Sequence, residues 1–186
     1  MNMNIQELDI KQKEVMGSGL EHQIFQSKTN PNLIYKVGHK DVVEEWFEVF
    51  KSNPEIFPKV FRAGKMKDTD YYYVELEKLD TKSFEKDWDD VFKKSLVKVG
   101  PLIFNRELSF TEFYLDNGSD SELFKDIAKA LYSYNKNYYN FFIQLLTVIK
   151  EAEKTISEVS GKETIVDAHK YNFGYGKDKK IKCLDL

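Results

Sequence analysis

The chain has 186 residues, 41% of them hydrophobic and 15% aromatic, so it is long enough to bury a core as one domain. Its formal net charge of -3 argues against the positive excess that non-specific nucleic-acid binding needs, so we expect no nucleic-acid partner. No apolar run reaches the length of a membrane span, residues 1–13 lack a signal-peptide core, and the single cysteine, Cys183, fits a reducing compartment. These features predict a cytoplasmic protein with no membrane partner.

The N-terminal part, residues 1–80, has the pattern of strands with one helix. Alternating apolar residues around glycine, an Asn-Pro-Asn turn and a polar Lys-Asp-Thr-Asp turn separate the predicted strands. Apolar residues at helical spacing indicate a helix between the second and third of these segments, with Asp41 as its N-cap. The predicted strand segments are 15–26, 33–37, 59–63 and 71–76, and the helix is 41–52.

The remaining residues, 81–186, are predicted to be mainly helical and to end in a β-hairpin. Apolar residues at three- and four-residue spacing predict helices near 83–97, 121–134 and 138–159, and Gly161 stops the last one. From residue 165 short strands surround a turn at Gly176. The expected fold class is therefore α+β.

The first segment with chemical potential is Gly17-Ser18-Gly19, between two predicted strands. Two glycines let the backbone bend over an anion and present N–H groups to phosphate oxygens. An ordinary hairpin turn is the alternative interpretation.

The second is Lys36, in the apolar strand 33–37. A lysine there should face a negative group, because a buried unpaired ammonium is costly, unless it lies on the solvent face. An acid on the following helix is expected to orient it: Glu45 is our first choice, with Glu44 and Glu48 as alternatives.

The third segment contains Asp167, Asn172 and Asp185, at offsets of 0, +5 and +18. Carboxylate and amide oxygens are the hard ligands that Mg²⁺ prefers. An Asp that accepts a hydroxyl proton, an Asn on the metal and an Asp bridging metal and phosphates together make a phosphoryl-transfer set. As isolated residues, Asp167 and Asn172 also fit caps or turns.

The combined pattern resembles the protein-kinase-like superfamily, and its aminoglycoside-phosphotransferase and choline-kinase branch most. Asp167, His169 and Asn172 match the D-x-H-x-x-N pattern of that branch's catalytic loop. By the same resemblance, Asp185 corresponds to the family's metal-binding aspartate and Lys36 to its strand-three lysine. The resemblance implies a single domain, with an N-lobe at 1–80 and a shortened C-lobe at 81–186. It also implies an adenine contact in the connector after the fifth strand, through backbone groups near Glu77 and Leu79.

The sequence departs from the family pattern at three places. His22 replaces the third glycine of the phosphate loop, and Ile165-Val166 replace the His or Arg that often precedes the catalytic Asp. The activation segment and later helices that usually follow Asp185 in relatives are not in this sequence.

The resemblance implies an ATP- and Mg²⁺-dependent phosphotransferase. Its catalytic residues are then Asp167, Lys36 and Asn172, with Asn172 and Asp185 on the metal, and the acceptor is a small molecule or a protein. The alternative is a pseudokinase that acts through a protein partner. A partner or a second copy of the chain could supply the C-lobe surface that relatives have, and the size suits an accessory protein of a phage or mobile element.

Overall fold

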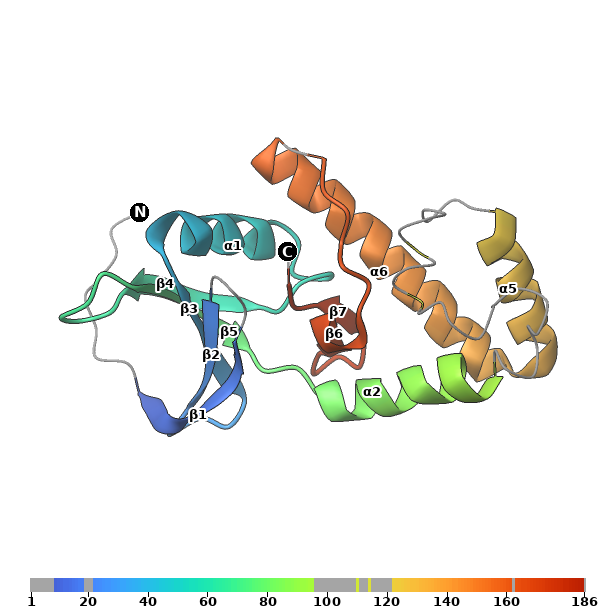
Figure 1. Cartoon of the computed structure of the whole chain (residues 1–186), viewed down its shortest axis with the longest axis horizontal. Coiled ribbons are helices and arrows are strands. Elements are labelled where there is room, and N and C mark those ends of the chain that lie inside the picture. Colours follow the sequence, from blue (N-terminus) through green and yellow to red (C-terminus); the bar gives the residue numbers. More distant parts are fainter. Residues whose placement is uncertain are drawn as a thin grey trace.

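The computed structural model describes residues 9–18, 22–95, 110, 114, 122–161 and 163–185. Five strands form one antiparallel sheet in the order β1-β2-β3-β5-β4, drawn in blue to green in Figure 1. The alternation of side chains in β3 places Ile34 and Lys36 on the face toward α1, and Tyr35 and Val37 on the other face. The strand bounds are β1 Ile10–Ser18, β2 His22–Ser27, β3 Leu33–Gly38, β4 Val60–Lys65 and β5 Tyr72–Glu77.

Helix α1, Lys40–Ser52, follows β3 and precedes β4 in the chain. It packs on the sheet, where it contacts β3, β4 and β5. Its inward face is apolar because its buried residues recur at helical spacing: Val43, Trp46, Val49 and Phe50. The predicted N-cap at Asp41 is wrong. The helix begins one residue earlier, after His39, and Asp41 lies in its first turn, where a negative charge complements the helix dipole.

The helical part begins with α2, Thr81–Asp89, which Asp80 caps by accepting a hydrogen bond from the Ser83 N–H at 3.0 Å. A π-helical segment, η1 Asp90–Ser95, continues it. Helices α5, Glu122–Tyr134, and α6, Lys136–Ser160, contact one another, and α6 also contacts α1. Gly161 ends α6 in the left-handed conformation at φ 71°, which confirms its predicted role.

The tail contains a short helical turn, η2 Lys170–Asn172, and the antiparallel pair β6 Phe173–Tyr175 and β7 Ile181–Cys183. Backbone hydrogen bonds in both directions between Asp80 and Tyr175 join this hairpin to the residue before α2. In Figure 1 the hairpin lies between the sheet, α2 and α6, and it contacts both helices.

One cluster of buried apolar side chains runs from the sheet through α1 into α2, α6 and β7. Sheet, helices and tail hairpin together confirm the α+β class. Across the ranges that the structure describes, no helix combines the length and the apolar character needed to cross a bilayer.

Candidate functional site

Lys36 and Asp185 form an ion pair between two segments far apart in the chain, 149 residues from one another. The Lys36 Nζ lies 2.5 Å from the Asp185 Oδ1 and 4.2 Å from the centre of the Trp46 ring. Lys36 is only 1% exposed, whereas the Asp185 side chain is 36% exposed. Burial lowers the pKa of Lys36 below its ordinary value, and the Asp185 carboxylate opposes that shift. The pair thus presents one accessible carboxylate beside one buried cation.

The prediction that Glu45 orients Lys36 is wrong. Glu45 is exposed, because residues one position apart on a helix point about 100° apart and Trp46 occupies the inward position. The neighbouring candidate Glu44 pairs with Lys40 at 3.7 Å, and Glu48 is also exposed. An indole face and a carboxylate from the tail therefore replace the expected helix acid at Lys36.

Asn172 links the Asp167 loop to the segment that carries Asp185. Its side-chain Nδ2 donates to the Asp167 carbonyl at 3.1 Å, and its own carbonyl accepts from the Leu184 N–H at 2.7 Å. Because the amide nitrogen is turned toward Asp167, the amide oxygen remains as the atom suited to a metal. Asp167 itself is exposed. Asn172 thus connects the backbone at Asp167 with the segment of Asp185, at the open end of the β6–β7 hairpin.

Glu153 on α6 braces the extended segment just before Asp167. Its carboxylate accepts from the Val166 N–H at 3.2 Å, while the Tyr114 hydroxyl lies 3.0 Å from both of its oxygens. Val166 and Ala168 are buried on either side of the exposed Asp167, as in a strand that alternates between core and solvent. Glu153 therefore fixes the point from which Asp167 projects.

The described part of the phosphate-loop prediction comprises Gly17 and Ser18, at the end of β1, whereas Gly19 lies outside the described residues. Gly17 pairs with Ile24, which in turn pairs with Lys36. Since neighbouring strands lie about 4.8 Å apart, this register puts the Gly17 backbone about 10 Å from that of Lys36. Gly17 therefore lies two strands away from Lys36, at the same level of the sheet.

The connector after β5 is attached to the tail by Glu77, which is 7% exposed. Its carboxylate accepts from the Lys177 N–H at 3.0 Å and from the Lys182 ammonium at 3.4 Å, and its backbone N–H donates to the Lys59 carbonyl at 2.9 Å. Glu77 thus has a structural role and its N–H is engaged. Within the described residues, by contrast, the Leu79 backbone N–H and C=O make no hydrogen bond.

Two groups of this site have oxygen atoms that could coordinate a metal ion: the Asp185 carboxylate and the Asn172 side-chain amide. Among the described residues no group of three or more His, Cys, Asp or Glu side chains is placed to hold a metal ion. One carboxylate and one amide do fit Mg²⁺, which usually keeps several waters and takes its remaining ligands from substrate phosphates.

Sequence reasoning missed two side chains of this site, Trp46 and Glu153. The helical period of α1 marks Trp46 as an inward residue, but nothing in the sequence places it under Lys36. Glu153 has no local signal, because its partners Tyr114 and Val166 lie 39 and 13 residues away. No protein-family model matches this sequence and no curated protein matches it, so its function is inferred from the arrangement of these side chains.

Proposed function

We propose that this protein is an ATP- and Mg²⁺-dependent phosphotransferase with a protein-kinase-like fold, which moves the γ-phosphate to a hydroxyl of a small molecule or a protein. The observation that carries the proposal is the contact between Lys36 and Asp185 at 2.5 Å. Lys36 corresponds to the strand-three lysine and Asp185 to the metal-binding aspartate of the resembled family. In a phosphotransferase both side chains act on the nucleotide phosphates, so they must lie close together.

The charges at the site suit a bound nucleotide. Within the described residues Lys36 is a buried cation with one carboxylate partner, so phosphate oxygens would add the negative charge that a desolvated ammonium favours. Asn172 and Asp185 would hold Mg²⁺, which when bound neutralises phosphate charge. The Asp185 side chain is 36% exposed, so solvent and a metal ion can reach it.

Asp167 is the proposed acceptor of the hydroxyl proton. Its exposure leaves the carboxylate accessible to an incoming hydroxyl, and its backbone is held by the Asn172 side chain and, through Val166, by Glu153. Such fixation matters because phosphoryl transfer depends on positioning and charge more than on covalent chemistry.

The connector supports an adenine site at Leu79. Its backbone N–H and C=O make no hydrogen bond within the described residues, and an adenine edge needs one acceptor and one donor. Leu79 also packs against Gly174 in β6, so this segment is held against the hairpin that leads to Asp185.

Asp167→Asn tests the proton-acceptor assignment. Without an acceptor, phosphate release from ATP in the presence of Mg²⁺ measures transfer to water, and the melting temperature measures nucleotide binding. We expect the variant to lose about 10²- to 10⁴-fold in phosphate release while it keeps the ATP-induced rise in melting temperature.

Asp70→Asn, which changes an exposed aspartate in the turn between β4 and β5, is the matched control and should behave as wild type. Full phosphate release by Asp167→Asn would contradict the role of Asp167. A wild-type protein that binds ATP but releases no phosphate, and phosphorylates nothing, would instead be the pseudokinase-type binding module.

A further inference from the structure

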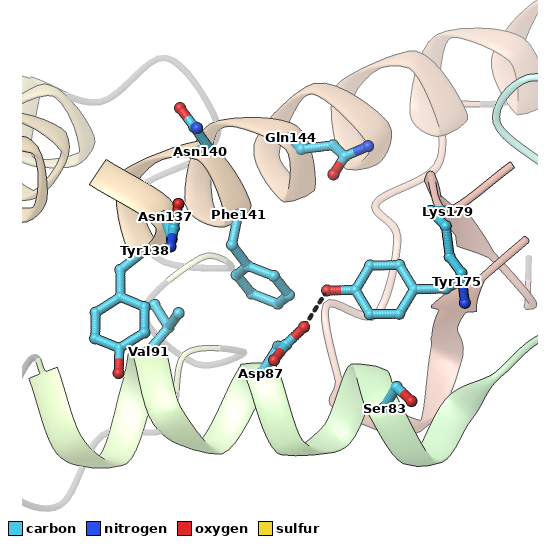
Figure 2. A pocket seen from close by; sticks show the side chains of 10 residues that line it. All are labelled: Ser83, Asp87, Val91, Asn137, Tyr138, Asn140, Phe141, Gln144, Tyr175 and Lys179. Atoms are coloured by element: carbon cyan, nitrogen blue, oxygen red, sulfur yellow. Dashed lines mark hydrogen bonds between the residues drawn. The ribbon is translucent and has the colours of Figure 1, made fainter. Parts of the chain in front are cut away.

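A cavity of about 560 Å³ lies between α2 and the first turns of α6, beside the tail hairpin. Figure 2 shows Phe141 reaching from α6 toward Asp87 on α2, with Tyr175 entering from β6. None of its lining residues belongs to the Lys36, Asp167, Asn172 and Asp185 group. Its volume falls within the range of about 300–1,000 Å³ that is typical of small-molecule sites.

One hydrogen-bonded polar pair lines this cavity. The Tyr175 hydroxyl donates to the Asp87 Oδ2 at 2.6 Å (Figure 2). Burial raises the pKa of Tyr175 well above its ordinary value, and the hydrogen bond to Asp87 raises it further, so the phenol keeps its proton. The Asp87 carboxylate therefore remains an acceptor with capacity for a second donor.

The rest of the lining is rich in groups that both donate and accept. Asn137, Asn140 and Gln144 supply side-chain amides from α6, and Ser83 supplies a hydroxyl from α2. Val91 and the rings of Tyr138 and Phe141 contribute apolar surface. A hydroxyl group also both donates and accepts, so amides match it better than they match a charged group.

The formal charges of the described lining residues cancel. Among these residues Asp87 is the single acid and Lys179 the single base, and Lys179 is exposed on the hairpin turn. One peripheral lysine is a poor phosphate site, because phosphate recognition relies on several converging donors or an Arg fork. One carboxylate that already accepts from Tyr175 is likewise a weak site for a cation.

We propose that this cavity binds a neutral sugar or cyclic polyol of mono- to disaccharide size. The hydroxyls would pair with Asp87 and the amides of α6, and the C–H face of the ring would lie on Phe141. The site is separate from the proposed nucleotide site, so the two proposals stand or fall independently.

Saturation-transfer NMR titrations of the full chain with glucose, maltose and myo-inositol test the proposal. At least one of these probes should bind saturably with a Kd below about 50 mM. Glucosamine and glucose 6-phosphate, which add a positive and a negative charge, should bind more weakly than glucose. Absence of saturable binding by all three neutral probes, or tighter binding of a charged analogue, overturns the proposal.

The double variant Asn137→Ala and Asn140→Ala locates the binding. Both residues are exposed, so we expect the fold to be kept and the Kd to rise about tenfold or more. Lys154→Ala, an exposed position on the same helix outside the cavity, is the matched control. Lys36→Ala should also leave sugar binding unchanged. An unchanged Kd in the double variant would place the sugar elsewhere and refute the assignment.

Discussion

At the scale of single residues, Glu153 offers a test of how the Asp167 segment is held. Burial raises the pKa of Glu153 above its ordinary value, against the hydrogen bonds from Tyr114 and Val166. A carboxyl group whose pKa rises on folding contributes stability below its unfolded pKa, and this contribution is lost as pH rises through the folded pKa. Glu153→Gln keeps an oxygen acceptor but cannot ionise.

We therefore expect the free energy of unfolding of Glu153→Gln, minus that of wild type, to increase as pH rises from about 4 to 7, because only the wild-type protein loses stability when Glu153 ionises. Urea denaturation at several pH values measures it, with the exposed Glu158→Gln on the same helix as control. Parallel pH profiles for wild type and variant would show that Glu153 is not the group responsible.

Residue identity was easier to predict from sequence than residue pairing. A lysine in an apolar strand indicates a buried charge that needs a partner, and Lys36 is indeed buried. Its partner was mistaken for Glu45, because local spacing cannot rank three acids on one helix against a carboxylate 149 residues away. Asp185 is brought to Lys36 by tertiary packing, and the residues that flank Lys36 in the sequence give no indication of that contact.

At the scale of elements, the contact between the tail hairpin and the connector predicts a contrast between two glycines. A Cβ added at Gly174 would lie 2.7 Å from the Leu79 Cβ, which moves only with its backbone. A Cβ added at Gly176 would meet side-chain atoms of Asp178 and Lys182, which can shift by bond rotation without moving their backbone. Gly174→Ala should therefore cost about 1–3 kcal/mol of stability through overpacking, and Gly176→Ala clearly less.

Urea unfolding of the two variants beside wild type gives both values. Equal losses would mean that β6 does not press against the connector in solution.

Element types followed closely from periodicity, while several boundaries did not. The apolar residues of α1 recur every three to four positions, which predicts a helix, and a glycine after the last periodic residue predicts the end of α6, where Gly161 has φ 71°. The start of α1 was mistaken, because packing of Val43 and Trp46 on the sheet outweighs the capping preference of Asp41.

At the scale of the whole molecule, the candidate site depends on contacts between the sheet and the tail. Lys36 comes from the third strand, whereas Asp167, Asn172 and Asp185 come from the tail, and Glu77 with Lys182 adds a second link between these parts. The order of these segments was visible in the sequence, but their convergence was not. Nor was the cavity between α2 and α6, because it depends on how two helices and a hairpin meet.

The melting temperature with ATP, measured with and without Mg²⁺ for wild type and Lys36→Ala, tests the central proposal most directly. A ligand that binds only the folded state stabilises it by mass action, by about 2.7 kcal/mol at a hundredfold excess over Kd. The proposal predicts a Mg²⁺-dependent rise for wild type that Lys36→Ala loses, while Lys40→Ala, at an exposed lysine of α1, keeps it. No rise for the wild-type protein at about 10 mM ATP would contradict nucleotide binding at this site.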